Sequence, residues 1–168
     1  MEITELYEMQ KALDARIIEE KGLQGQDLLP NTVLALQVEI AELANEWRGF
    51  KHWSNDKAPR IEKMLEEYVD CLHFFLSIAR QLGVPLYQLD INHQEIKEDT
   101  IKIFIDIITA VGLIDYVDYS NLDDNAFWDA LDQFIALGTQ RLGFTWKQIE
   151  AAYLAKNAVN HDRQATGY

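Results

Sequence analysis

LQVEIAELANEWRGFKHW, residues 36–53, holds the pattern on which the fold and the chemistry depend. Its apolar positions recur at a spacing close to 3.6 residues, which predicts an amphipathic helix. Glu39, Glu42 and Glu46 stand at i, i+3 and i+7, so they fall on one side of that helix, at the border of its apolar face. Like charges at this spacing weaken a helix that stands alone. The three glutamates therefore need partners that the helix itself does not supply.

The helical spacing extends along the chain on both sides of this stretch. Helices are predicted at about 3–21, 31–47, 59–82, 94–111, 124–142 and 146–162. Asn31 or Thr32 is expected to cap the second helix, and Thr145 with Gln148 forms a capping box for the last. No stretch shows the alternation of a strand. The sequence thus predicts an all-α bundle of about six helices in a single domain, 1–168.

The composition restricts the possible partners. The chain has 168 residues, a hydrophobic fraction of 48% and a net charge of −13. Phosphate backbones bind basic surfaces, so direct binding of nucleic acid is not expected. No apolar run reaches the length of a membrane span, and no basic segment opens the chain, so neither a membrane span nor a signal peptide is expected. Cys71 is the only cysteine, which excludes an internal disulfide and fits a cytoplasmic location.

A second acidic pair, Glu67 and Asp70, lies on the third predicted helix. A pair alone carries little weight, because 28 acids in 168 residues produce roughly four or five such pairs by chance. Both pairs, however, border the apolar faces of their helices. If the two helices pack through these faces, Glu39, Glu42, Glu67 and Asp70 converge and repel one another unless a cation lies among them. Carboxylate oxygens favour Mg²⁺ or Mn²⁺, so the sequence predicts a metal site.

A di-iron bundle is the alternative metal site. That chemistry uses Glu-x-x-His elements on two different helices. Only Asp70 and His73 approach such an element here, because Glu42 stands where the other helix would need its histidine. The pattern therefore favours the magnesium or manganese site.

Two polar residues stand inside the apolar stripe of the first predicted helix, Gln10 and Asp14. Buried polar groups need hydrogen-bond partners, and internal partners are one explanation. The other is that the Gln10 amide contacts the edge of a nucleobase, because an amide offers both a donor and an acceptor.

Aromatic side chains lie close to both acidic pairs. His73 and Phe74 follow the second pair, and Trp47 and Trp53 bound the connector after the first. Packing in the core explains such residues in most helical proteins, and stacking on a flat ring is the alternative. Both interpretations stay open for these positions.

The last predicted helix carries a basic face in an otherwise acidic chain. Lys156, Asn160 and Arg163 lie on one side of it and extend its apolar stripe. Lysine and arginine in this arrangement can bind a polyphosphate. A solvated, frayed C-terminus is the alternative.

Taken in order, these motifs resemble those of the dimeric, all-α dUTPases, a branch of the MazG-like nucleoside triphosphate pyrophosphohydrolases. That group has Glu-x-x-Glu on one helix and Glu-x-x-Asp on the next, as in the two pairs described above. The dUTPase branch adds a glutamine near the N-terminus, an aromatic connector, a His-Phe pair and a C-terminal Lys-x-x-x-Asn-x-x-Arg element followed by Gly-Tyr. The matching positions are Gln10, the WRGFKHW connector of 47–53, His73, Phe74, Lys156, Asn160, Arg163, Gly167 and Tyr168.

The resemblance implies an enzyme, a dUTP diphosphatase, which hydrolyses dUTP to dUMP and pyrophosphate, with dUDP as a further candidate substrate. It implies two or three Mg²⁺ ions, with Mn²⁺ as a substitute. Their ligands would be the four carboxylates of the acidic pairs, Glu39, Glu42, Glu67 and Asp70. Glu39 would position and deprotonate the attacking water, and Lys156 and Arg163 would stabilise charge on the phosphates.

The resemblance also assigns the base pocket. Gln10 and Phe74 would bind uracil together with Trp47 or Trp53. Two weaker candidates for the same pocket are Asp14 and His73, and Asn160 would contact phosphate or sugar. The family works as a homodimer, and its sites can take residues from both subunits.

Two other functions remain open at this point. One is a related pyrophosphohydrolase with another base preference, such as dCTP or a damaged nucleotide, because the amide of Gln10 can turn to present either pattern. The other is a non-catalytic helical dimerisation module. The intact carboxylate pairs argue against this second alternative, because a binding module has no need of converging acids.

Overall fold

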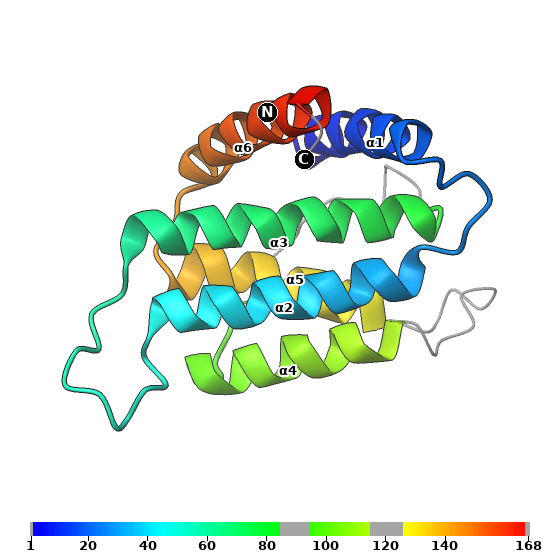
Figure 1. Ribbon diagram of the computed structural model, residues 1–168. Helices are drawn as coiled ribbons and strands as arrows, with labels where there is room; N and C mark the ends of the chain where they lie inside the picture. The colour runs from blue at the N-terminus through cyan, green and yellow to red at the C-terminus, as the bar shows by residue number, and fades with distance from the viewer. Residues whose placement is uncertain (1, 85–94, 115–125, 167–168) are drawn as a thin grey trace.

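The computed structural model describes residues 2–84, 95–114 and 126–166, and this part of the chain is predominantly helical and contains no β-strand (Figure 1). The all-α fold class predicted from the sequence is confirmed. The helices are α1 (Ile3–Glu20), α2 (Leu29–Trp47), α3 (Ile61–Gln81), α4 (Thr100–Leu113), α5 (Ala126–Ala136) and α6 (Trp146–Thr166), with a π-helical segment, η3 (Leu137–Arg141), directly after α5. In the part described, no helix combines the length and the apolar character that crossing a membrane requires.

Helix α3 lies at the centre of this arrangement (Figure 1). The pair α1 and α6 lies side by side over one side of α3, and α2 packs along another side. Helix α4 packs against both α2 and α5. The sequence explains the central place of α3, because the second half of this helix is mostly apolar and such a segment belongs in a core. Its buried side chains include Met64, Tyr68, Val69, Leu72, Phe75 and Leu76.

Tyr68 holds α3 against α5 and η3. Its ring stacks on Phe134 with ring centroids 4.3 Å apart, and its hydroxyl donates to the backbone oxygen of Phe134 at 3.3 Å. Gly138 lies against the same ring, where an added Cβ would come within 2.4 Å of Tyr68. This close approach requires a glycine inside the helix. It also fixes the turn of α3 that carries Glu67 and Asp70.

The start of α2 differs from the sequence prediction. The helix begins at Leu29, two residues or more before the expected caps Asn31 and Thr32. Pro30 is accommodated in the first turn, where its missing N–H has no intrahelical partner to lose. Thr32 instead lies inside the helix and donates its hydroxyl to the backbone oxygen of Leu28 at 2.8 Å.

Two further helix ends test the predicted capping. The predicted capping box of α6 is confirmed, since the backbone N–H of Gln148 donates to Thr145 Oγ1 at 3.3 Å and that of Thr145 donates to Gln148 Oε1 at 2.9 Å. Helix α4 begins six residues later than predicted, because the side chain of Asp99 caps it by accepting from the N–H of Ile101 at 2.8 Å. The predicted start, residue 94, lies outside the described residues, as do Gly167 and Tyr168.

Candidate metal centre and adjoining pocket

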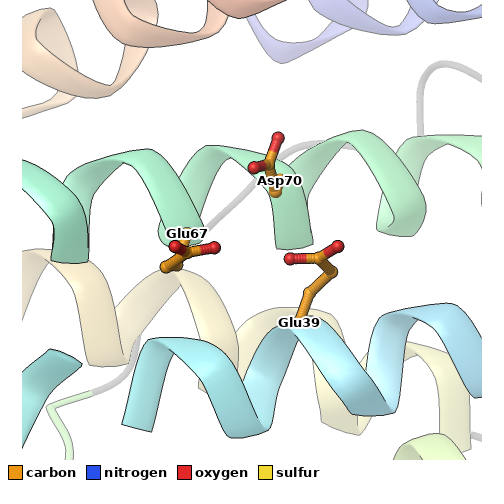
Figure 2. A group of neighbouring side chains, drawn as sticks. All are labelled: Glu39, Glu67 and Asp70. Carbon is orange, nitrogen blue, oxygen red and sulfur yellow. The ribbon is translucent and has the colours of Figure 1, made fainter. Parts of the chain in front are cut away.

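Three carboxylates from two neighbouring helices converge on one point (Figure 2). Glu39 comes from α2, and Glu67 and Asp70 come from α3. One oxygen from each of the three side chains lies within 4.8 Å of the others. The three-residue spacing places Glu67 and Asp70 on one face of α3, where Glu39 meets them from α2. The structure thus brings together three of the four carboxylates that the sequence assigns to a metal site.

The other two glutamates of residues 36–53 have different surroundings. Glu42 is exposed, and its charge raises the pKa of both Glu39 and Glu67, so it stands at the edge of the cluster. Glu46 is buried, and its two carboxylate oxygens accept hydrogen bonds from Arg60 Nη1 at 3.1 and 3.2 Å. The partner of Glu46 is therefore Arg60, and this ion pair fastens the end of α2 to the start of α3.

Burial and mutual repulsion disfavour the ionised forms of the cluster. The pKa of Glu39 rises to about 7, chiefly because burial disfavours its charge and further because of the charges of Asp70, Glu42 and Glu67. The pKa values of Glu67 and Asp70 are also raised, again mainly by burial. A divalent cation would relieve this repulsion, and carboxylate oxygens are the ligands that Mg²⁺ and Mn²⁺ prefer. The donor set therefore fits a hard divalent ion.

We expect the metal-free protein to lose stability as Glu39 ionises. Its ordinary pKa of 4.5 governs the unfolded chain, while the pKa in the folded protein is about 7. Between pH 4.5 and 7 the folded protein therefore binds more protons than the unfolded chain. The stability that protonated Glu39 contributes is complete below pH 4.5 and is lost as the pH rises through 7. Urea unfolding in EDTA across this range should show a steeper decline for wild type than for Glu39→Gln, which cannot titrate. An equal decline in stability for the two proteins would contradict the raised pKa of Glu39.

Lys156 of α6 brings a positive charge to the cluster. Its Nζ lies 2.5 Å from Asp70 Oδ2 and 3.3 Å from Glu66 Oε1. Burial disfavours the charged lysine, but the hydrogen bond and the charge of Asp70, assisted by Glu66, outweigh that effect and raise the pKa of Lys156. The lysine is therefore protonated at neutral pH and is held beside the carboxylates.

A pocket of about 260 Å³ adjoins the cluster and is lined by residues of α1, α2, α3 and α6. Glu39, Asp70 and Lys156 form part of its wall. Six further lining residues are ones that the sequence predicts to bind substrate: Gln10, Asp14, His73, Phe74, Asn160 and Arg163. The structure thus gathers the carboxylates, the basic face of α6 and the polar residues of α1 around one cavity.

The polar residues of α1 are buried in a hydrogen-bond network at the wall of this pocket. Gln10 Nε2 donates to Asp14 Oδ1 at 2.8 Å, while Gln10 Oε1 lies 2.6 Å from His73 Nδ1 and 3.0 Å from the hydroxyl of Tyr153. Burial, assisted by the charge of Lys156, lowers the pKa of His73 to about 3, so its ring is neutral. The internal hydrogen bonds that the sequence offers as one explanation are therefore present.

Neither tryptophan of the connector lines this pocket. Trp47 packs on Phe104 of α4, with ring centroids 5.3 Å apart. Trp53 is 66% exposed, and its ring meets those of Phe50 and His52 edge to face. Within a single chain, therefore, neither tryptophan is placed to stack on a base in this pocket.

Four lining residues escape the sequence analysis: Leu13, Ile17, Ser77 and Gln164. Ser77 lies one helical turn after His73, and Gln164 lies one turn after Asn160, so i, i+4 spacing from the predicted residues would locate both. Gln164 Oε1 is buried and has no hydrogen-bond partner in the part of the chain that the structure describes. It therefore offers an acceptor to a ligand.

Comparisons with known proteins agree with the resemblance seen in the sequence. The dUTPase family matches residues 2–168, which is almost the whole chain. A comparison with curated proteins finds none that matches. Because the match covers the helices that build the cluster and the pocket, the chain belongs to the all-α dUTPase family, whose members are dUTP diphosphatases.

Proposed function

We propose that this protein hydrolyses dUTP to dUMP and pyrophosphate in a reaction that requires Mg²⁺. The observation that carries the proposal is the convergence of Glu39, Glu67 and Asp70 beside a pocket that also contains Lys156. Membership of the dUTPase family supports dUTP as the substrate.

The three converging carboxylates would hold the Mg²⁺ ions, and Glu42 would contribute from the edge of the cluster. Bound Mg²⁺ would neutralise phosphate charge, which allows a protein with a net charge of −13 to bind a triphosphate. Mn²⁺ prefers the same oxygen ligands and is expected to substitute.

Glu39 is proposed as the general base. Its carboxylate lines the pocket and meets those of Glu67 and Asp70, so a water held there would lie between the metal ligands and a bound phosphate. Its carboxylate would accept a proton from the attacking water as the water oxygen bonds to phosphorus. The phosphorus–oxygen bond that links the α- and β-phosphates through the attacked phosphorus breaks at the same time, which gives dUMP and pyrophosphate.

Helix α6 is proposed to bind the phosphates. Lys156 and Arg163 carry positive charge into the pocket, and both charges oppose the rise in the pKa of Asp70 that burial causes, so both act close to the cluster. They would stabilise the negative charge that grows on the leaving group. Asn160 lines the same pocket and would donate to a phosphate or sugar oxygen.

Uracil would lie against α1 and α3. Gln10 and His73 would contact the edge of the base, Phe74 would pack on its face, and Asp14 would hold the Gln10 amide. Trp53, exposed on the connector, would reach a base only in the pocket of a partner chain.

A homodimer is part of this proposal. Large apolar side chains are exposed on two helices that pack against each other, α2 and α4, and a second copy would cover them. They are Leu34, Val38, Ile101 and Ile105.

Lys156→Met should lower kcat/KM for dUTP by about a hundredfold, because it removes a partly buried positive charge next to the proposed phosphate site. Lys11→Met is the matched control. Lys11 is exposed and pairs only with Glu8 at 3.5 Å in the described part of the chain, so its loss should leave the rate unchanged. Steady-state kinetics of both variants checks this, and equal effects would remove Lys156 from the phosphate site.

Product analysis tests the proposed function. The purified protein would be incubated with dUTP, dCTP, dTTP or UTP, in Mg²⁺ or in EDTA, and the products resolved by chromatography. We expect dUMP and pyrophosphate from dUTP in Mg²⁺ alone. Turnover that persists in EDTA would overturn the metal site, preferred turnover of another nucleotide would overturn the uracil pocket, and absence of all turnover would overturn the enzymatic function.

A further inference from the structure

We infer that Arg80, Ser77 and Asp14 are positioning residues that fix the amide of Gln10, and through it the tautomer of His73, so that the pocket accepts uracil and rejects cytosine. This inference rests on the proposed function, because it concerns how the same pocket distinguishes bases. It assigns a role to Arg80 and Ser77, two residues that take no part in the proposed hydrolysis itself.

The first step is the orientation of Asp14. This residue is buried, and its Oδ2 accepts hydrogen bonds from the hydroxyl of Ser77 and from Nε of Arg80, each at 2.7 Å. A guanidinium can only donate, so Oδ2 is committed to these two partners. The remaining oxygen, Oδ1, faces Gln10 as an acceptor.

The second step is the orientation of the Gln10 amide. Its nitrogen lies 2.8 Å from Asp14 Oδ1, and a carbonyl oxygen turned to the same place would meet a carboxylate without a proton between them. The amide therefore presents its nitrogen to Asp14 and its oxygen to His73. Tyr153 does not decide this orientation, because its hydroxyl can also donate to the backbone oxygen of Leu6 at 3.1 Å.

The third step is the tautomer of His73. Gln10 Oε1 can only accept, and it lies 2.6 Å from His73 Nδ1, so Nδ1 carries the hydrogen. The ring is buried and neutral, and its Nε2 has no hydrogen-bond partner among the described residues. Nε2 is thus a buried acceptor without a partner, in a residue that lines the pocket, and in this proposal the base supplies the missing donor.

The pattern that results distinguishes the two pyrimidines. In this proposal the base would meet an acceptor, His73 Nε2, and a donor, the second amide hydrogen of Gln10. Uracil presents an N3–H donor between two carbonyl oxygens and complements both. Cytosine presents a bare N3 and an amino group, so acceptor would face acceptor and donor would face donor. A buried mismatch of this kind is costly, and sites built on hydrogen bonds reject such analogues strongly.

The hydrogen-bond relay runs from Arg80 and Ser77 through Asp14 and Gln10 to His73. Asp14→Asn tests this relay with almost no change in side-chain volume. The oxygen of the new amide must stay toward Arg80 and Ser77, so its nitrogen would face Gln10 and turn that amide over. His73 Nδ1 would then accept and Nε2 would carry the hydrogen. We expect the ratio of kcat/KM for dUTP to that for dCTP to fall at least about tenfold.

The matched control is Glu46→Gln, which makes the same carboxylate-to-amide change at another buried acid that pairs with an arginine, outside the pocket. Its ratio of dUTP to dCTP turnover should equal that of wild type. A ratio that Asp14→Asn leaves unchanged, or that Glu46→Gln lowers equally, would overturn the relay.

Nitrogen NMR of the His73 ring gives a readout that needs no turnover. Two-bond proton–nitrogen spectra of the substrate-free protein, assigned with a His73→Gln variant, distinguish a protonated Nδ1 from a protonated Nε2. We expect a protonated Nδ1 in wild type and a protonated Nε2 in Asp14→Asn. A protonated Nε2 in wild type would overturn the relay even if the variant does not fold. If wild type hydrolyses no nucleotide, the proposed function fails while this spectrum still decides the tautomer.

Discussion

Glu39→Gln is expected to lower kcat for dUTP hydrolysis at least about a hundredfold while the protein stays folded. The substitution keeps the volume of the side chain but removes a metal ligand and the proposed general base at once. It also removes one of three carboxylates whose oxygens lie within 4.8 Å of one another. In EDTA near pH 8 the variant should therefore unfold at a higher temperature than wild type, because a repulsive charge is gone.

A variant that loses activity but gains stability has lost a functional group, whereas a variant that is merely misfolded would lose both. Glu46→Gln serves as the control, because Glu46 is a buried glutamate of the same helix that pairs with Arg60 rather than with the cluster. That variant should lose stability and keep its kcat. Activity near the wild-type level in Glu39→Gln would show that Glu39 is neither ligand nor base.

Gly138→Ala is expected to destabilise the protein by about 2 kcal/mol or more. The added Cβ would lie 2.4–2.5 Å from two ring carbons and the hydroxyl oxygen of Tyr68, a side chain that is stacked on Phe134 and fully buried. Neither ring can move without disturbing the core, so the clash exceeds the helical preference of alanine, which favours alanine over glycine by about 1 kcal/mol.

Gly112→Ala is the matched control for this substitution. Among the described residues its Cβ would come close only to Gln37 Nε2, at 2.9 Å, which is the end of a flexible side chain. We expect Gly112→Ala to be neutral or stabilising in urea unfolding and Gly138→Ala to lower the midpoint clearly. Equal midpoints would mean that η3 and Tyr68 adjust freely, and that they do not fix the turn of α3 next to the cluster.

The periodic parts of the structure could be predicted from the sequence. The apolar spacing of residues 36–53 and the pairs at i, i+3 place Glu39, Glu67 and Asp70 at the border between two helices, and they do converge. Gln10 lies within the apolar stripe of α1 and is indeed buried. Both results follow from helical geometry and the burial of apolar surface.

Other features depend on contacts between distant segments, which spacing within one helix does not reveal. Glu46 has the same helical position as the cluster acids, but Arg60, fourteen residues later, takes its carboxylate. The network around Asp14 depends on Arg80 of α3, sixty-six residues away. Trp47 and Trp53 lie together in the sequence, yet one packs against the core and the other is exposed.

Binding of Mn²⁺ tests the central claim most directly, namely that Glu39, Glu67 and Asp70 form a divalent metal site. Electron paramagnetic resonance of free Mn²⁺ would be followed while wild type or Asp70→Asn is added, with Mg²⁺ as competitor. We expect wild type to remove the free signal, Mg²⁺ to restore it, and Asp70→Asn to bind at least about tenfold more weakly. Equal binding by the two proteins, or none by wild type, would contradict the assignment of the metal site.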